Sequence, residues 1–219
     1  GLMNAPSTFQ RLMDLVMSGL VFEVCLVYLD DIVIFSRSLD EHLQRLELVL
    51  QRLIATGLKL KPSKCNLLQR QVTFLGHVIS EEGIATDPAK TEQIVAWPTP
   101  NSVHEVRQFL GLCSYYRRFV SHYAEKASPL TALLKKGQKF CWTESCRDAF
   151  QTLKEALMSP PILGMPREPP DTPDGLEGTF ILDTDASDLS IGCVLSQVQD
   201  GQERVIAYGA RTLQPAQRN

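Results

Sequence analysis

The sequence predicts an α+β fold, in which short β-hairpins alternate with amphipathic helices. Two apolar runs, residues 21–29 and 32–35, are separated only by Asp30 and Asp31, which indicates a hairpin with two carboxylates at its tip. Apolar residues recur at helical spacing on both sides of this hairpin. With 219 residues and 44% hydrophobic composition, the chain is long enough for one large core or two small ones.

The first half of the chain is predicted to alternate helices and strands. Residues 4–18 carry apolar side chains at helical spacing, and Ser38 with Glu41 forms a capping box at the start of a second helix. Residues 72–79 are typical of one strand, which we expect to turn at residues 80–83 into a second hairpin.

The second half is predicted to be helical first and β-rich last. Helices are expected to start at Asp87, Ser102 and Thr143, and Pro215 opens a further one. An extended, proline-rich connector is expected over residues 159–178. The predicted strands beyond it are residues 180–182, 191–196 and 205–208.

Composition narrows the possible functions. The net charge is −3, but residues 58–80 carry basic side chains and no acid, whereas acids predominate from residue 141 onward. This asymmetry suits a protein that holds a phosphate backbone on its middle part and metal ions elsewhere, and a merely solvated surface is the alternative. The six cysteines form no CxxC pair and the four histidines are scattered, so we expect reduced, structural cysteines and no zinc site.

The chain carries no targeting signal that we recognise. No apolar run approaches the roughly 20 residues needed to span a bilayer, and the first residues lack the regions of a signal peptide. We therefore expect no membrane partner and an intracellular, cytoplasmic setting.

The two adjacent carboxylates at the hairpin tip indicate a cation site. Aspartate is unfavourable in strands, so Asp30 and Asp31 between apolar runs are best explained by a divalent cation. Mg²⁺ prefers carboxylate and phosphate oxygens, and nucleotidyl transfer uses two such ions about 3.5–4 Å apart. An acidic turn whose carboxylates face solvent is the alternative.

Here the sequence resembles the reverse transcriptases of gypsy-type LTR retrotransposons. Their ordered motifs occur as Gly1-Leu2-Met3-Asn4-Ala5-Pro6-Ser7-Thr8-Phe9-Gln10, Tyr28-Leu29-Asp30-Asp31, Lys64-Cys65, Phe74-Leu75-Gly76-His77, Asp87-Pro88 with Lys90, and Phe109-Leu110-Gly111-Leu112 with Tyr115-Tyr116-Arg117-Arg118-Phe119. The resemblance covers essentially the whole chain. It implies the C-terminal half of a polymerase palm over residues 1–85, a helical thumb and connection over 86–140, and the opening strands of an RNase H-like α/β domain over 141–219.

The resemblance also implies roles for individual residues. Asp30 and Asp31 would bind the catalytic Mg²⁺ ions, with Mn²⁺ as an alternative, and Tyr28 would lie under the primer end. The implied nucleotide- and template-facing residues are Asn4, Pro6, Phe9 and Gln10. The implied primer-binding residues are Phe74, Leu75, Gly76 and His77, and the implied nucleic-acid backbone contacts are Lys64, Arg117 and Arg118.

Purely structural roles are the alternative for several of these residues. Phe74 and Leu75 could be core, and His77 could be a satisfied polar residue. The pair Tyr115 and Tyr116 could be ordinary packing, and the two arginines that follow could be solvated surface.

The last acidic cluster resembles the first strand of a ribonuclease H domain. By position in Phe180-Ile181-Leu182-Asp183-Thr184-Asp185-Ala186-Ser187-Asp188, the Mg²⁺-binding aspartate is Asp185. Strand alternation places Asp183 on the same face, whereas Asp188 lies past the turn. A turn closed by Ser187 or by Asp188 would account for the cluster structurally.

The first hypothesis is therefore a fragment of a Pol polyprotein that copies RNA into DNA and degrades the RNA of the hybrid. The expected partners are an RNA template, a DNA primer, the RNA–DNA hybrid, dNTPs and the rest of the polyprotein. A retroelement particle is the alternative to a free cytoplasmic location. The family places further metal carboxylates before Gly1 and after Asn219, so we expect the 219 residues alone to catalyse little.

A non-catalytic, host-retained remnant that binds nucleic acid or protein is the second hypothesis, and a structural subunit that needs a partner chain is the third. The oligomeric state is left open.

Overall fold

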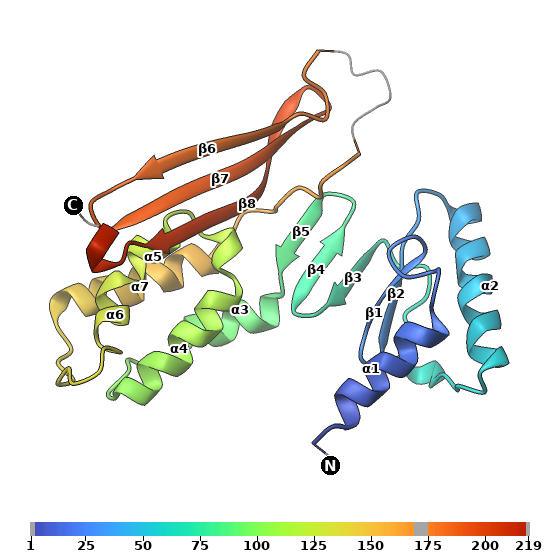
Figure 1. Ribbon diagram of the computed structural model, residues 1–219, viewed down its shortest axis with the longest axis horizontal. Coiled ribbons are helices and arrows are strands. Elements are labelled where there is room, and N and C mark those ends of the chain that lie inside the picture. The colour runs from blue at the N-terminus through green and yellow to red at the C-terminus, as the bar shows by residue number, and fades with distance from the viewer. Residues whose placement is uncertain (1–2, 169–174, 218–219) are drawn as a thin grey trace. The chain divides into compact units, whose positions relative to one another are not determined.

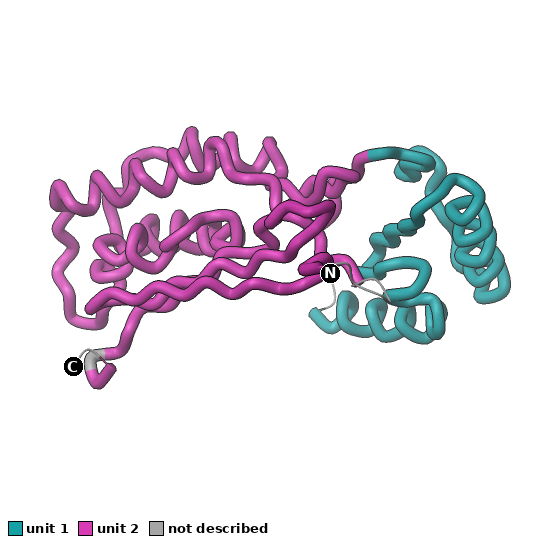
Figure 2. The backbone as a smooth tube through the Cα atoms, turned by 90° about the horizontal axis from the view of Figure 1, so that it is seen from above, with its two compact units in different colours: residues 1–70 teal, residues 71–219 magenta. Residues whose placement is uncertain are grey.

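The computed structural model describes residues 3–168 and 175–217, in two compact units, Gly1–Arg70 and Gln71–Asn219 (Figures 1 and 2). The helices are α1 (Ala5–Val16), α2 (Leu39–Ala55), α3 (Pro88–Val95), α4 (Val103–Tyr115), α5 (Tyr123–Lys126), α6 (Ser128–Ala132) and α7 (Glu144–Met158). The strands are β1 (Cys25–Tyr28), β2 (Asp31–Ile34), β3 (Gln71–Phe74), β4 (His77–Ser80), β5 (Gly83–Thr86), β6 (Phe180–Ala186), β7 (Ser190–Gln199) and β8 (Gln202–Thr212). Single 3₁₀ turns are η1 (Pro62–Lys64), η2 (Arg117–Phe119) and η3 (Pro215–Gln217).

The first unit packs two helices around one hairpin. α1 and α2 both present apolar faces, and the buried residues of this core are Met13, Val16, Met17, Cys25, Val49 and Leu53. Ser38 caps α2 as predicted, because its hydroxyl accepts from the Glu41 N–H at 3.3 Å. The hairpin is confirmed, but its first strand starts at Cys25 and Asp31 already belongs to the second strand, so the predicted run 21–29 is too long.

The second unit begins with a three-stranded antiparallel sheet in the order β3-β4-β5. The pattern of residues 72–79 predicted one strand, and this prediction is wrong, because the chain reverses at Leu75 and Gly76. Both residues adopt positive φ, and the apolar run on either side hides that reversal from a periodicity argument. The turn matches the place that the family resemblance gave to the primer-binding residues.

Helices predicted at Asp87, Ser102 and Thr143 are present as α3, α4 and α7, each with the expected N-cap side-chain hydrogen bond. The short helices α5 and α6 were not predicted, since four- and five-residue helices carry too little periodicity. The segment from α3 to α7 supplies most of the core of the second unit. Its largest buried side chains include Phe109, Tyr116, Phe119, Leu130 and Leu153.

A second antiparallel sheet, β6-β7-β8, packs against these helices within the same unit. Its strands are longer than predicted, and β7 and β8 are joined by a turn at Asp200–Gly201. At Pro215 the structure has a 3₁₀ turn in place of the predicted α-helix start. Figure 1 shows the sheet as the outer layer of the unit, with α5 and α7 beneath it.

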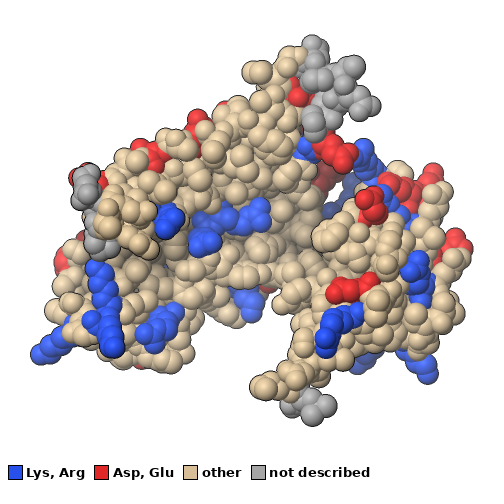
Figure 3. All heavy atoms as spheres, viewed as in Figure 1, with Lys and Arg blue, Asp and Glu red and all other residues tan. Residues whose placement is uncertain are grey.

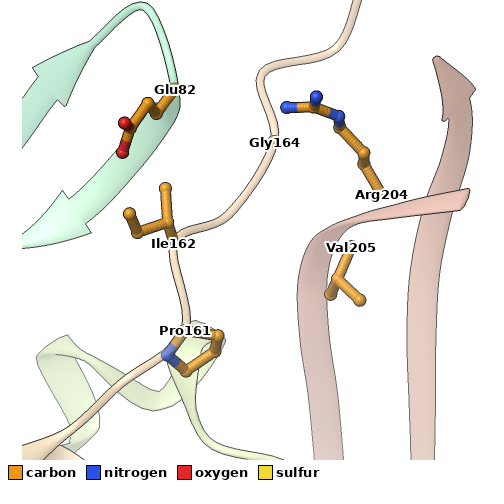
Figure 4. Close-up of a pocket in the computed structure, with 6 residues that line it drawn as sticks. All are labelled: Glu82, Pro161, Ile162, Gly164, Arg204 and Val205. Atoms are coloured by element: carbon orange, nitrogen blue, oxygen red, sulfur yellow. The ribbon is translucent and has the colours of Figure 1, made fainter. Parts of the chain in front are cut away.

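The described part of the connector joins the two sheets of the second unit. Leu163 exchanges backbone hydrogen bonds with Ile84 of β5 at 2.8 and 2.9 Å, and the Gly164 N–H donates to Val205 of β8 at 2.7 Å. This segment passes a cavity with Glu82 on one wall and Arg204 on the other (Figure 4). Residues 169–174 of the predicted connector lie outside the described residues.

Charged side chains are spread unevenly over the surface of the second unit. In the view of Figure 3, acidic side chains follow the outer edge of the second unit along β6, whereas lysine and arginine side chains lie over β8 and over the helices below it. In the part of the chain that the structure describes, no helix has the length and apolar character needed to cross a membrane. All six cysteines are free thiols.

Candidate functional site

The tip of the first hairpin carries the two adjacent carboxylates. Tyr28 pairs with Asp31, so the turn itself consists of Leu29 and Asp30. Leu29 adopts φ +54°, a conformation that costs an L-residue other than glycine about 1–2 kcal/mol. Asp30 and Asp31 are both exposed. The hairpin therefore presents two carboxylates to solvent on a short, backbone-paired support.

Gln10 of α1 holds this turn from behind. The Leu29 N–H donates to Gln10 Oε1 at 2.5 Å, and Gln10 Nε2 donates to Asp14 Oδ1 at 2.8 Å. A side chain that the resemblance assigned to nucleotide or template contact thus has an internal partner. The bond couples α1 directly to the residue that precedes Asp30.

The other predicted nucleotide-facing residues lie at the start of α1. Asn4 is the N-cap residue, its side chain makes no capping bond, and Pro6 lies in the first turn. Phe9 and Tyr28 are exposed aromatic residues, at 37% and 50% of their full accessible area. They are available for stacking on a base or sugar, and their assigned contacts stay predictions.

The second carboxylate pair lies on β6. Asp183 and Asp185 line one cavity, as strand alternation predicts, together with His122, Gly192 and Tyr208. Asp185 Oδ2 lies 4.0 Å from His122 Nδ1, and both side chains are substantially exposed.

The turn after β6 is closed by Ser187, one of the two structural explanations that the sequence left open. Its hydroxyl accepts from the Leu189 and Ser190 N–H groups at 3.4 and 3.2 Å. Asp188 lies in this turn, beyond the strand. It is therefore not part of the Asp183–Asp185 face.

Sequence reasoning missed His122 as a neighbour of this pair. It is far from β6 along the chain and adopts φ +51° before α5. Gly192 opposite it leaves room, since a Cβ there would lie 3.4 Å from His122 Nδ1. No local sequence signal marks such a contact, because it depends on how the sheet packs on the helices.

The turn between β3 and β4 is held by aromatic residues at the end of α4. Leu75 and Gly76 have φ values of +49° and +70°, the signs of a type I′ turn. Tyr116 Oη donates to the Gly76 carbonyl at 2.8 Å, and the hydroxyl of Tyr115 donates to the Leu75 carbonyl. The two tyrosines therefore hydrogen-bond the backbone of the turn as well as pack against it.

His77 follows this turn and lies among three aromatic rings. The ring centroids of Tyr115, Tyr116 and Phe119 are 5.4, 5.6 and 5.6 Å from that of His77. His77 Nδ1 is 2.9 Å from the Leu75 carbonyl, whereas its buried Nε2 has no partner among the described residues. Burial lowers the pKa of His77, and the nearby Arg118 adds to that effect, although the hydrogen bond to the Leu75 carbonyl opposes it. His77 therefore has one hydrogen-bonded and one unpaired ring nitrogen, and the three aromatic rings form a ring cage around it.

The three predicted backbone-binding cations have different surroundings. Lys64 in η1 and Arg117 in η2 are exposed, which leaves them free to contact a phosphate. Arg118 is partly buried, its Nη2 donates to the Ile206 carbonyl at 3.3 Å, and its guanidinium lies over the Phe119 ring at 5.8 Å. The structure thus uses Arg118 to join η2 to β8, and its contact with nucleic acid stays a prediction.

The donor atoms at both carboxylate pairs suit a hard cation. Carboxylate oxygens are the ligands that Mg²⁺ prefers, and both pairs are exposed enough to admit a hydrated ion. Within the described ranges, however, no group of three or more His, Cys, Asp or Glu side chains could hold a metal ion. Each pair therefore fits as a part of a metal site.

Two protein families match separate parts of the chain. Residues 1–79 match the family described as reverse transcriptase (RNA-dependent DNA polymerase), and residues 142–219 match the RNase H-like domain found in reverse transcriptase. The two matches contain the Asp30–Asp31 turn and the Asp183–Asp185 strand, respectively.

Relatives in Drosophila melanogaster match the whole chain. The Retrovirus-related Pol polyprotein from transposon 297 is 43% identical over 97% of this chain and 19% of its own length. The corresponding polyprotein from transposon gypsy is 36% identical over 100% of this chain and 21% of its own length. The chain thus spans about a fifth of the length of these curated relatives.

Solved structures with the same fold come from foamy virus. The foamy viral protease-reverse transcriptase dRH in complex with double-stranded DNA has a TM-score of 0.83 and 25% identity, covering 98% of this chain and 36% of that chain. The protease-reverse transcriptase in complex with RNA/DNA hybrid has a TM-score of 0.78 at 24% identity, covering 99% of this chain and 28% of that one, and shows the fold. Ordered motifs, fold and full-length matches agree: the chain belongs to the reverse transcriptase and RNase H-like region of gypsy-type LTR-retrotransposon Pol polyproteins.

Proposed function

We propose that this chain is part of an RNA-directed DNA polymerase with an associated ribonuclease that cleaves RNA in RNA–DNA hybrids. The observation that carries the proposal is the Leu29–Asp30 turn, which exposes Asp30 and Asp31 on a hairpin tied to α1 by Gln10. A rigid, exposed carboxylate pair is what a nucleotidyl-transfer site requires. The corresponding pair for hybrid hydrolysis is Asp185 and Asp183, which lie on the same face of β6.

Asp30 and Asp31 would hold Mg²⁺ in the first site, and Asp185 would hold it in the second. When bound, the metal supplies Lewis-acid activation of the attacking oxygen and stabilises the leaving group. The chain's own residues fix the geometry. Gln10 orients the turn through the Leu29 N–H, and the exposed Tyr28, which pairs with Asp31 across the hairpin, would lie under the primer end.

The substrates we propose are an RNA template, a DNA primer, the RNA–DNA hybrid and dNTPs. Foamy viral relatives with this fold are described in complex with double-stranded DNA and with RNA/DNA hybrid, which supports duplex binding here. Exposed cations at Lys64 and Arg117 and the aromatic side chains at Phe9 and Tyr28 suit phosphate and base contacts, respectively.

The two activities can be separated by matched substitutions in the polyprotein that contains this chain. Asp31→Asn is expected to abolish primer extension on RNA and leave hybrid cleavage in place, whereas Asp185→Asn should do the reverse. Asp188→Asn, in the turn beyond β6, is the control and should preserve both activities. Primer extension that survives both Asp30→Asn and Asp31→Asn would contradict the polymerase assignment.

A non-catalytic nucleic-acid binding module is the second candidate. It is favoured by one observation, that the described residues supply only pairs of carboxylates and no larger metal-binding group. The candidates are separated when duplex binding by the 219-residue chain and primer extension by the longer polyprotein are measured side by side. Binding that is insensitive to Mg²⁺ and to Asp30→Asn, with no extension by the longer polyprotein, would support the binding module.

A further inference from the structure

His122 approaches the second carboxylate pair from a different segment of the same unit. It lies in the loop between η2 and α5, whereas Asp183 and Asp185 lie on β6. Helix α5 packs against β7 and β8, so the residue that precedes it comes to lie at the sheet (Figure 1). His122 Nδ1 and Asp185 Oδ2 are 4.0 Å apart, and both residues line one cavity of about 110 Å³. The cavity therefore joins the helical segment to the carboxylate strand.

The start of α5 holds the backbone of His122. The residue adopts φ +51°, in the left-handed region, which histidine tolerates better than most residues with a side chain. Its carbonyl accepts from the Glu125 and Lys126 N–H groups, both at 3.1 Å. Lys126 Nζ also donates to the Ser121 carbonyl at 2.6 Å. These bonds fix the point from which the imidazole extends.

Gly192 of β7 leaves room for the imidazole on the sheet. A Cβ at Gly192 would lie 3.4 Å from His122 Nδ1 and 3.8 Å from His122 Cε1, so this ring edge packs directly on the strand backbone. The same edge faces Asp185. Arg118, earlier in the loop segment, donates from Nη2 to the Ile206 carbonyl of β8 at 3.3 Å. The segment that carries His122 is therefore attached to the sheet on both sides of the imidazole.

The cavity combines two carboxylates with one side-chain nitrogen. Carboxylates repel a phosphodiester, so a group that donates to a phosphate oxygen favours its entry. Among the described residues that line the cavity, His122 alone carries a side-chain nitrogen. At 4.0 Å, Nδ1 is too far from Asp185 Oδ2 for a hydrogen bond, and neither ring nitrogen makes another one within the described ranges. Neutral imidazole has one N–H and the charged form has two, so a donor is present in either state.

We propose that His122 is a substrate-binding residue of the hybrid-cleavage site, where its imidazole donates to a phosphate oxygen of the RNA strand beside Asp185. This inference rests on the proposed ribonuclease function and adds a contact that the helical segment supplies to it. The side chains of His122 and Asp185 are 48% and 74% exposed, so one phosphate can reach both. The site is thus built from two segments that are distant in sequence.

Two substitutions at this position remove or keep the donor without straining the backbone. His122→Gly deletes the imidazole, and glycine adopts positive φ freely. His122→Asn keeps a side-chain N–H donor and also tolerates the left-handed region. In the polyprotein that contains this chain, His122→Gly should lower kcat/KM for hybrid cleavage about tenfold, mainly through KM, whereas His122→Asn should stay within about threefold. Urea denaturation followed by tryptophan fluorescence checks that both variants keep the fold.

A binding measurement tests whether the imidazole contacts a phosphate. RNA–DNA hybrids carry one neutral methylphosphonate in the RNA strand, with a 2′-O-methyl group on the ribose before it, and the reference hybrid carries the 2′-O-methyl group alone. Fluorescence anisotropy in Ca²⁺ gives the affinity of each polyprotein variant. For the unaltered protein we expect one position at which affinity falls about tenfold. In His122→Gly the same methylphosphonate should have no further effect, because its partner has been removed.

His104→Gln is the matched control, because it removes an exposed histidine of α4. It should retain the kinetic constants and the methylphosphonate pattern. Equal losses of kcat/KM in His122→Gly and His122→Asn overturn the substrate contact, as does a methylphosphonate pattern that is absent from the unaltered protein or survives in His122→Gly. Each of these results leaves the proposed ribonuclease function standing, whereas failure of the unaltered polyprotein to cleave any hybrid contradicts both.

Discussion

Two hairpin turns of this molecule, at Leu29–Asp30 and at Leu75–Gly76, are built alike and held differently. Each contains two residues, and each begins with a leucine in the left-handed region, Leu29 at φ +54° and Leu75 at φ +49°. The turn at Leu29 is completed by Asp30 and held by one side chain, Gln10. The turn at Leu75 is completed by Gly76 and held through both of its carbonyls.

This difference follows from what each turn presents. The first turn offers side-chain carboxylates, so its support contacts a backbone N–H and leaves Asp30 and Asp31 exposed. The second turn carries no charged side chain, and its support contacts the Leu75 and Gly76 carbonyls.

The largest effect is expected at the second turn, from Gly76→Ala. The residue has φ +70°, and the new Cβ would lie 3.1 Å from Tyr116 Oη, so both backbone conformation and ring packing oppose it. We expect the free energy of unfolding to fall by about 1–3 kcal/mol. Both tryptophans, Trp97 and Trp142, lie in residues 71–219, so tryptophan fluorescence in a urea titration reports this unit.

Gly111→Ala is the control for that substitution, because it lies within α4 and a Cβ there meets nothing within 4 Å. It should be neutral or stabilising, since alanine is the better helix former. Equal stability of the two variants would show that the turn adapts and that the rings do not fix it.

The next effect is expected at the first turn, from Gln10→Ala. Loss of the bond from the Leu29 N–H to Gln10 Oε1 should reduce the stability of the first unit by about 1 kcal/mol. It should also speed hydrogen exchange at the Leu29 amide. Gln51→Ala, which removes an exposed bond to Glu47 within α2, is the control and should change neither measurement. Unchanged exchange in Gln10→Ala would mean that the turn needs no support from α1.

Much of this architecture could be predicted from sequence, because local signals mark it. The capping residues Ser38, Ser102 and Thr143 fixed three helix starts, and strand alternation placed Asp183 and Asp185 on one face. The reversal at residues 75–76 was lost in a continuous apolar run when periodicity alone was used.

The candidate site was predictable where motifs are contiguous, and not where distant segments meet. The Asp30–Asp31 pair is adjacent in sequence, so its hairpin is visible in the pattern. The contact of Gln10 with Leu29 and the approach of His122 to Asp185 depend on tertiary packing. Residues such as Gln10 and His122, which belong to no contiguous acidic motif, can therefore support a site without any local sequence signal.

A smaller effect is expected when the same substitution is made at both leucines. Asparagine tolerates the left-handed region better than leucine, so Leu29→Asn and Leu75→Asn should each stabilise their unit by about 0.5 kcal/mol. Urea denaturation followed by circular dichroism measures the first and tryptophan fluorescence the second. Stabilisation at one turn only would show that leucine packing, and not backbone strain, distinguishes the two turns.

The smallest effect concerns pH and is confined to the second turn. Burial lowers the pKa of His77 below its ordinary value of 6.5, so the folded state binds this proton less readily than the unfolded chain. The contribution of His77 to stability is therefore complete above about pH 6.5 and is lost as the pH falls toward its folded pKa. His77→Gln should reduce the loss of stability between pH 7.5 and pH 5.5, measured by urea denaturation with tryptophan fluorescence, whereas His104→Gln on the exposed side of α4 should not. An identical pH dependence in His77→Gln and the unaltered chain would mean that the ring cage accommodates the charged imidazole, and that the second turn is held by the tyrosine hydroxyls alone.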